Sequence, residues 1–387
     1  MDEALARETG AALDALEAWF ERTGPSGYDP YDALASPLLR ALGLGLKWPR
    51  IAVTQTLRRL PFNPRRWLLV PRTVNPKGLA LLVRGHLARW RTLGRPASRE
   101  RALELGTLLA RLRSPGWEHA CWGYPFPWQS RAFYLPAHAP NIVVTSFVGE
   151  ALLDLHEAGG DGSALALARS ACRFLTEDLR RREEEGAFCF SYSPRDETAV
   201  YNASLLGAAL LARVGAFDAG DQALDAARRA AKFVIRRQRD DGSWTYAGTS
   251  FQGWIDAIHT GFLLDSLRAV ARLASMPEAE QAAARGQRFF LDRFLSPDGA
   301  VATFLHRPRP YDVHAGTEAI LTLCAAGPEE ALARTARWFL RTFRDPSGSF
   351  VYRVGRLLRA RIPYHRWGQA WAFRALAALE ARLAGPP

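Results

Sequence analysis

The feature that most constrains how this chain can fold is a repeated sequence pattern: an amphipathic stretch, a glycine-aromatic turn and then a nearly uncharged apolar stretch. The turns contain Gly186, Gly242, Gly299 and Gly348, which follow one another at intervals of about 50 to 57 residues. Periods of this length are typical of proteins that stack repeated structural units. We therefore expect one repetitive architecture along most of the chain.

The helices that this pattern predicts are of two kinds. Residues 221–238 place apolar side chains on one face and arginines on the rest, as in a helix with one face in water. Residues 203–212 are apolar almost all round and must be covered on every side. Stretches of the second kind occur six times, at residues 75–93, 140–158, 200–215, 255–274, 312–326 and 366–384. We therefore predict an all-α fold, an (α/α)6 toroid of six hairpins with short β-like turns, in which an outer ring of helices surrounds an inner ring.

The chain is predicted to consist of two parts. Residues 1–66 should form an amphipathic helix and an irregular, proline-punctuated segment that wraps around the toroid. Residues 67–387 should form the toroid itself. We expect the two parts to fold as one cooperative unit, because repeat proteins are stabilised by contacts between neighbouring units.

The positive charge of the chain is unevenly distributed. Residues 33–99 contain 12 Arg, 2 Lys and no acidic residue, so this region accounts for the net charge of +12. The arginines are mixed with Leu, Trp and Phe, which suits an anionic membrane surface or a lipid-linked phosphate, and equally an acidic polysaccharide. A genome that favours arginine is the alternative, since Lys occurs only three times. Nucleic acid is not an expected partner, because no recognition-helix, zinc-finger or ribonucleoprotein motif is present.

The N-terminus and the cysteines indicate a cellular compartment. The first residues are acidic and no long apolar stretch follows them, so we expect neither a signal peptide nor a membrane-spanning helix. The four cysteines do not have the spacing of metal ligands. We predict free thiols, no metal or other cofactor, and a cytoplasmic protein that is peripheral to the inner membrane.

In such a toroid, the side chains that meet at one mouth come from the starts of the inner helices and from the loops before them. Asp256 and His259 are three residues apart and share a helix face, and Asp312 and His314 lie at another helix start. Aspartate also caps helices, and histidine also occurs in cores, so each residue alone has a structural explanation. Together they predict a catalytic set, which consists of Asp256, Asp312, His259, His314 and Tyr201.

Aromatic rings and planar polar groups at the same mouth suit a sugar, because rings stack on its apolar face while amide and guanidinium groups bond to its hydroxyls. Residues 114–140 form a long aromatic loop, and structured loops of this length are usually functional. Core packing is the alternative explanation for the tryptophans. We predict that a substrate contacts Trp122, Tyr124, Trp128, Gln129, Arg131, Asn141, Asn202, Tyr364, Arg366, Trp367 and Gln369.

Several segments resemble known proteins. Residues 238–244, Gln-Arg-Asp-Asp-Gly-Ser-Trp, are similar to a turn of terpene cyclases, but the chain lacks their aspartate-rich motifs and the zinc-binding Cys-His-Gly set of lanthionine cyclases. More broadly, the chain resembles the six-hairpin α/α-toroid superfamily, which includes glycoside hydrolases, uronate lyases and epimerases. Residues 122–129, 201–206, 254–261 and 366–371 look like segments of a poorly characterised bacterial and archaeal group encoded in exopolysaccharide gene clusters. This resemblance implies a role in polysaccharide biosynthesis and does not specify a reaction.

Four functions remain open at this point. The first is a glycoside hydrolase-like enzyme that uses Asp256 and Asp312, since hydrolysis needs two carboxylates about 5–5.5 Å apart for retention or about 6.5–9.5 Å apart for inversion. The second is a uronate lyase or epimerase, in which His or Tyr abstracts a proton while Asn202 and Arg366 hold the carboxylate. The third is a non-catalytic scaffold protein, whose aromatic mouth binds an oligosaccharide or lipid-linked glycan while residues 33–99 dock on an anionic membrane surface. The fourth is a terpenoid-processing toroid.

Overall fold

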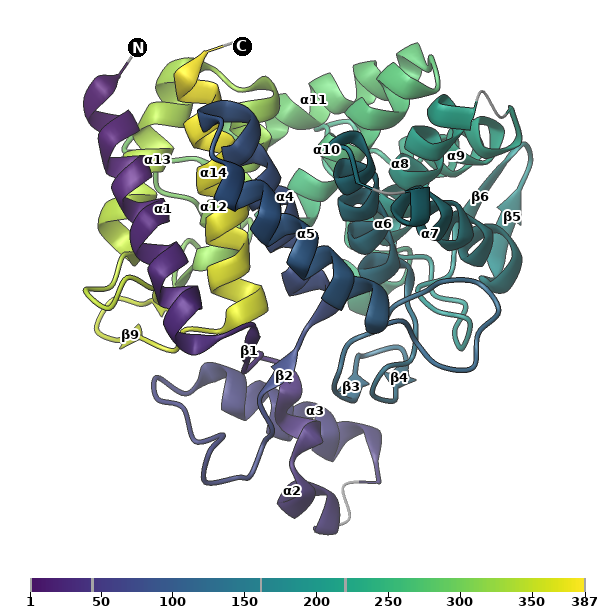
Figure 1. Ribbon diagram of the computed structural model, residues 1–387. Helices are drawn as coiled ribbons and strands as arrows, with labels where there is room; N and C mark the ends of the chain where they lie inside the picture. The colour runs from purple at the N-terminus through teal and green to yellow at the C-terminus, as the bar shows by residue number, and fades with distance from the viewer. Residues whose placement is uncertain (1, 43–44, 161, 219–220, 386–387) are drawn as a thin grey trace.

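The computed structural model describes residues 2–42, 45–160, 162–218 and 221–385 (Figure 1). Helices make up most of these residues, and the strands are only two to four residues long. The predicted all-α class is therefore confirmed. No helix in the described part of the chain is long and apolar enough to cross a membrane.

Six helices form a closed inner ring. They are α4 (Pro76–Leu93), α6 (Ile142–Glu157), α8 (Tyr201–Asp218), α10 (Ala257–Leu273), α12 (Val313–Ala326) and α14 (Trp371–Ala384). Each helix packs against the next, and α14 packs against α4, so the ring has no open edge. These helices coincide with the six apolar stretches of the sequence, which confirms the prediction. Their side chains are buried on nearly all faces. One face of each inner helix points into the ring, and the outer helices cover the opposite face.

The outer ring consists of helices that follow the inner helices in sequence, with one exception. Five hairpins are completed by α5 (Pro96–Arg111), α7 (Gly162–Arg173), α9 (Asp221–Ile235), α11 (Pro277–Phe294) and α13 (Glu329–Phe343). The sixth outer position is filled by α1 (Glu3–Thr23), which packs against α14 and α13. The two ends of the chain therefore form the last hairpin together, and both termini lie at the same end of the molecule (Figure 1).

The repeated glycines have a structural reason that explains the sequence pattern. All four have a positive φ, between 63° and 89°, a region that glycine adopts without strain. A Cβ added to Gly299 would lie 2.4 Å from the carbonyl carbon of Arg334 on α13, and one added to Gly348 would lie 2.6 Å from Ala15 O on α1. The turns at Gly242, Gly299 and Gly348 thus pack directly on the backbone of the following outer helix, and Gly348 attaches α1 to the ring.

The remaining elements are short. The strand pairs are β1 (Ser26–Gly27) with β2 (Thr73–Val74), β3 (Trp128–Gln129) with β4 (Tyr134–Leu135), and β5 (Arg181–Glu184) with β6 (Ala187–Phe190), all antiparallel. A three-stranded antiparallel sheet contains β7 (Tyr311–Asp312), β8 (Arg353–Val354) and β9 (Arg359–Ala360). Short 3₁₀ turns are η1 (Asp32–Ala35) and η3 (Ser250–Gln252), and π-helical turns are η2 (Phe174–Asp178) and η4 (His365–Ala370).

The segment between α1 and α4 lies outside the two rings. It contains α2 (Pro37–Ala41) and α3 (Lys47–Arg59) and projects beyond one end of the rings, at the bottom of Figure 1. Arg65 fastens it: this buried side chain lies 2.5 Å from Asp32 Oδ1 and donates to the Tyr364 hydroxyl at 2.7 Å. The segment therefore wraps one mouth of the toroid. The domain boundary at residue 66 stays a prediction.

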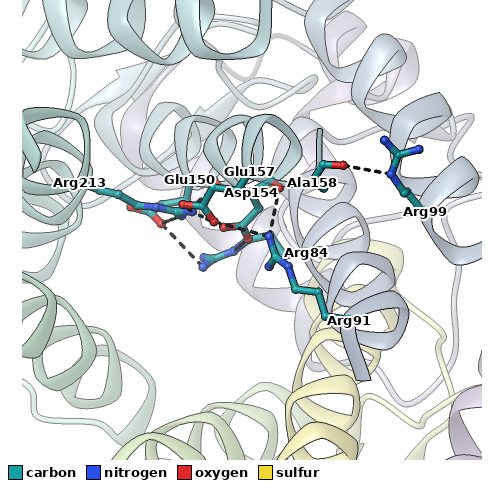
Figure 2. Close-up of polar contacts among 8 residues, drawn as sticks. All are labelled: Arg84, Arg91, Arg99, Glu150, Asp154, Glu157, Ala158 and Arg213. Carbon is teal, nitrogen blue, oxygen red and sulfur yellow. Dashed lines mark hydrogen bonds and ion pairs between the residues drawn. The ribbon is translucent and has the colours of Figure 1, made fainter. Parts of the chain in front are cut away.

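Away from that mouth, ion pairs connect the inner helices (Figure 2). Arg84 on α4 lies 2.8 Å from Asp154 on α6, and Arg213 on α8 lies 2.8 Å from Glu150 on α6. These groups are largely buried, and a buried carboxylate is tolerated when a cation and hydrogen bonds satisfy it. The network therefore links three neighbouring inner helices through polar groups that the surrounding apolar core would otherwise exclude.

Candidate active site

A cavity of about 1930 Å³ lies at the N-terminal ends of the inner helices. Its lining comes from the starts of α4, α8, α10 and α12, from the loops before them, and from α3 of the wrapping segment. The most deeply buried part of the lining includes Lys77, Asn202 and His314, which are 3%, 4% and 2% exposed. We call these three residues the floor of the cavity.

The structure brings together eleven of the sixteen predicted site residues. They line this one cavity: Tyr124, Trp128, Gln129, Arg131, Asn202, Asp256, His259, Asp312, His314, Arg366 and Trp367. Sequence reasoning could find them from two signals. The helix starts have the same place in every repeat, and Tyr124, Trp128, Gln129 and Arg131 belong to the long aromatic loop of residues 114–140. What each residue does there remains a prediction.

Five predicted residues do not line the cavity, which corrects their expected placement: Trp122, Asn141, Tyr201, Tyr364 and Gln369. Trp122 belongs to the core, where its indole nitrogen donates to Leu109 O at 3.0 Å. Asn141 caps α6 by accepting from Val144 N at 3.0 Å. Helix starts need such caps because the first backbone N–H groups have no partner within the helix.

The other three residues are also used internally. The amide of Gln369 accepts from Phe350 N and donates to Phe350 O, both at 2.8 Å. The Tyr364 hydroxyl accepts from Arg65, and the buried Tyr201 ring packs 6.4 Å from the ring of Phe233. Residue type alone does not distinguish a polar side chain that faces the cavity from one that holds neighbouring backbone.

Asp256 and His259 form the most organised polar pair of the lining. Asp256 caps α10: its Oδ1 accepts from His259 N at 2.8 Å, and its Oδ2 lies 2.6 Å from His259 Nδ1. The indole of Trp254 donates to the same carboxylate at 3.0 Å. Because a carboxylate can only accept, Nδ1 carries the proton and Nε2 is the nitrogen left for a ligand. Asp256 is buried while the His259 side chain is 28% exposed.

His314 is an unpartnered imidazole on the floor. Neither ring nitrogen has a hydrogen-bond partner among the described residues. Burial, reinforced by the nearby charges of Lys77 and Arg366, holds the pKa of His314 well below its usual range, so the ring is neutral. The ring lies 4.5 Å from the rings of both Trp367 and Trp371. It can therefore accept or donate a hydrogen bond toward a ligand.

Asp312 is fully engaged by the protein. Its Oδ1 accepts from His314 N at 3.1 Å and from the Trp367 indole at 2.8 Å, while Arg353 lies 2.8 Å from Oδ2. The side chain is 1% exposed. The carboxylate thus positions His314 through its backbone N–H and Trp367 through its indole ring.

Arg366 lines the cavity, but Asp29 already neutralises its charge. The guanidinium makes two contacts with this carboxylate, at 2.6 and 2.7 Å. Sequence reasoning did not include Asp29, and no sequence signal connects it with a residue so far along the chain. A free charge on Arg366, as the lyase alternative requires, is therefore not what the structure shows.

Sequence reasoning also missed part of the lining. Lys77 is the second residue of the first inner helix, near the repeat position where the other helices carry polar residues, so the pattern could have identified it. Tyr246 and Trp254 form a stacked pair with ring centroids 4.4 Å apart. Arg58 of α3 lies over the ring of Tyr31, with its guanidinium carbon 4.8 Å from the ring centre. Tertiary contacts bring α3 to the cavity. Because α3 lies outside the repeated units, the repeat pattern could not predict that Arg58 lines the cavity.

The charge of the lining is strongly positive. Within the described ranges, ten Lys and Arg side chains line the cavity, against three carboxylates. Such a surface attracts anions, because charges of one sign in a cleft raise the local concentration of the opposite sign. No group of three or more His, Cys, Asp or Glu in the part of the chain that the structure covers could hold a metal ion.

Comparison with known proteins identifies the fold. No protein-family profile and no curated protein matches the sequence. Cellobiose 2-epimerase from Bacillus thermoamylovorans is similar in structure with a TM-score of 0.67 at 10% identity, over 97% of this chain and 99% of that one. The chain has the (α/α)6-toroid fold. An unsaturated glucuronyl hydrolase from Bacillus sp. GL1 gives 0.61 at 15% identity over 97% and 96% of the two chains. An α-mannanase from Bacteroides thetaiotaomicron gives 0.59 at 13% over 79% and 86%.

Proposed function

We propose that this toroid is a glycan-active enzyme whose substrate binds in the cavity at the inner-helix N-termini. The aromatic rings of the lining provide flat apolar surfaces for sugar rings. Buried polar atoms without partners, such as Asn202 Oδ1 and both nitrogens of His314, match the hydroxyl and carbonyl groups of a sugar. The toroids of similar structure described above include an epimerase, a glucuronyl hydrolase and a mannanase, which supports this class of function.

Two reaction types fit the lining, and the contacts of the carboxylates favour one of them. In the hydrolase-like reaction, Asp256 and Asp312 would act as acid and nucleophile or base. Both carboxylates already accept three hydrogen bonds or ion contacts each. In proton transfer by His259, by contrast, Asp256 keeps the contacts with His259 that the structure shows. The contact between Asp256 and His259 is the observation on which we base this preference.

In the favoured reaction, His259 Nε2 removes a proton from a sugar carbon next to a carbonyl or carboxyl group. Asp256 stabilises the imidazolium that forms, as a carboxylate does for the histidine of a catalytic triad. His314 is neutral and can donate its N–H to the oxygen on which negative charge develops. The products then follow from the fate of the carbanion: return of the proton gives an epimer, and loss of a leaving group gives an unsaturated sugar.

The test is an exchange assay in deuterated water with reducing and acidic oligosaccharides, followed by NMR, by absorbance of unsaturated uronates and by reducing-end release. Deuterium incorporation or unsaturation that disappears in His259→Gln supports proton transfer. The matched control is His119→Gln, because His119 also pairs with an aspartate, Asp178 at 2.9 Å, but lies outside the cavity lining. Release of reducing ends without either signal would identify a hydrolase.

We also propose that the wrapping segment docks on an anionic membrane, which would present a lipid-linked glycan to the cavity. Large apolar side chains of this segment are exposed: Leu42, Leu46, Trp48, Phe62, Trp67 and Leu69, at 52% to 75%. Exposed basic residues, among them Arg59 and Arg66, accompany them, and residues 33–99 contain no acidic residue. Apolar anchors with basic residues are typical of proteins that bind anionic lipid surfaces. A cytoplasmic location at the inner membrane and a role in exopolysaccharide biosynthesis belong to this proposal.

Not every basic residue of the region contributes to that surface. Arg65 is buried against Asp32, Arg89 is buried against three carboxylates, and Arg58 faces the cavity. The basic residues of the 33–99 region therefore do not all contribute to one positive face. Acidic partners from other parts of the chain neutralise part of its charge.

A further inference from the structure

Lys77 occupies an unusual place for a cation. It lies in the first turn of α4, whose cap Asn75 accepts from Lys77 N at 3.1 Å, and its side chain reaches the cavity. Its Nζ lies 4.0 Å from the ring centre of Phe147, 5.1 Å from that of Phe262 and 5.2 Å from that of Trp371. Three aromatic rings thus surround an ammonium group that is almost completely removed from bulk solvent.

The charged groups that act on this ammonium group include Arg366, Glu318 and Asp29. None of the described carboxylates forms an ion pair with Lys77. Of the charged groups that face it, Arg366 is paired with Asp29. Burial together with Asp265 holds the pKa of Glu318 well above its usual range, which favours the neutral form of that carboxyl. His314, which shares Phe262 and Trp371 as neighbours with Lys77, is neutral. Burial and Arg366 lower the pKa of Lys77 itself.

A buried cation without a partner is costly, and proteins usually pair it or leave it neutral. The aromatic rings stabilise the charged form only in part. The missing stabilisation is what an anionic ligand would provide. Because Lys77 faces the cavity rather than the core, a ligand in the cavity can reach it.

We propose that Lys77 and His314 form a subsite that binds the carboxylate of a uronic acid unit. This inference rests on the proposed glycan-binding function and specifies its substrate class. A single ammonium group balances the single charge of a carboxylate, whereas a phosphate carries about −1.5 to −2 and would leave a buried charge unbalanced. Of the three rings, Phe262 also lines the cavity and offers a face for the sugar ring, and Asn202 Oδ1 can accept from one of its hydroxyls. The basic lining above the floor suits further acidic units of the same chain.

The experiment compares the binding of D-glucuronate, D-glucuronamide, D-glucose and inorganic phosphate by titration calorimetry. The wild-type protein should bind glucuronate at least about tenfold more tightly than the uncharged amide, since a hydrogen bond to a charged partner contributes about 1.5–3 kcal/mol. Lys77→Met should remove this preference, and Lys77→Arg should retain part of it. Lys232→Met, a change of the same kind at an exposed position of α9, should bind as the wild type does.

A second measurement does not depend on how the variants fold. Binding of glucuronate should be accompanied by proton uptake, seen as a dependence of the heat on the ionisation enthalpy of the buffer, because the ligand favours the charged form of Lys77. Equal binding of glucuronate and glucuronamide, or an unchanged preference in a folded Lys77→Met protein, would overturn the proposal. Tighter binding of phosphate would overturn the assignment to a carboxylate. If the His259→Gln protein binds glucuronate but shows no turnover, binding at this subsite is shown to be independent of the proposed proton transfer.

Discussion

Arg366 and Asp29 form a two-point ion pair, with Arg366 Nε 2.6 Å from Asp29 Oδ2 and Nη2 2.7 Å from Oδ1, although 337 residues separate them in sequence. Both side chains are buried, at 4% and 5% exposure. The pair connects the wrapping segment with η4, which leads into the last inner helix. The wall of the cavity is therefore held by a contact between opposite ends of the chain, and the site exists only after the ring has closed.

Asp29→Asn should destabilise the protein by about 3–5 kcal/mol, because it leaves the Arg366 guanidinium buried without a counter-charge. Urea unfolding measures this change. The matched control is Glu3→Gln, which removes one partner of an exposed pair, Arg7 with Glu3, whose side chains are 74% and 86% exposed. That substitution should leave the unfolding midpoint nearly unchanged. Equal effects of the two substitutions would contradict a structural role for the buried pair.

Asp256→Asn should lower kcat by about 10²- to 10⁴-fold with little change in KM, because an amide neither fixes the Nδ1–H form of His259 nor stabilises its imidazolium. The deuterium-exchange or elimination assay provides both constants. Asp178→Asn removes the carboxylate from the other pair, His119 with Asp178, and should have no effect on kcat. An Asp256→Asn enzyme that folds and retains its kcat would show that this aspartate serves only as a helix cap.

Gly348→Ala should destabilise the protein more than Gly24→Ala. Both glycines have a positive φ, 89° and 72°, so alanine is strained at each, by about 1–2 kcal/mol. A Cβ at position 348 would also lie 2.6 Å from Ala15 O, whereas nothing lies within 4 Å of one at position 24. Thermal unfolding of both variants measures the difference, which reports how tightly α1 is attached. Equal losses would mean that the contact with α1 adjusts without cost.

The protein should lose stability as the pH falls from about 6.5 to about 4. Burial lowers the pKa of His365 to about 4, while an unfolded chain has its usual value near 6.5. In this window the unfolded state binds the proton first, so protonation favours unfolding, at about 1.4 kcal/mol per pH unit for this group. Urea titrations at several pH values measure the slope. His365→Gln should reduce it, and substitution of the exposed His306 by Gln should not.

Vesicles that contain phosphatidylserine should bind the protein, and binding should weaken as salt rises, because screening shortens to about 8 Å at physiological ionic strength. Leu46→Ser should reduce this binding, since Leu46 is 73% exposed in the wrapping segment. Leu357→Ser makes the same change at a residue that is 95% exposed in the turn between β8 and β9, and it should bind normally. Co-sedimentation with the two kinds of vesicle measures the binding. Equal binding to neutral and anionic vesicles, or no binding to either, would contradict docking on an anionic membrane.

The repeat made the fold predictable from sequence. Six apolar stretches, each paired with an amphipathic one, have few ways to bury all their surfaces other than two concentric rings, and the structure has these rings. The same periodicity placed His259 and His314 at one mouth, because residues at equivalent repeat positions meet at the same end. The polar residues that turned out to be caps, such as Asn141, occupy equivalent positions, so the pattern could not separate them from residues of the cavity.

By itself, the sequence determined the helix periodicity, the number of inner helices and the end of the toroid at which polar groups gather, since all three depend on residues that are close together in the chain. Only the tertiary structure decided which charges remain free. Arg366 receives Asp29 from the other end of the chain, while no carboxylate of the described residues forms an ion pair with Lys77. Electrostatic energy depends on distance in space and on burial, and closure of the ring sets both for residues that are far apart in sequence.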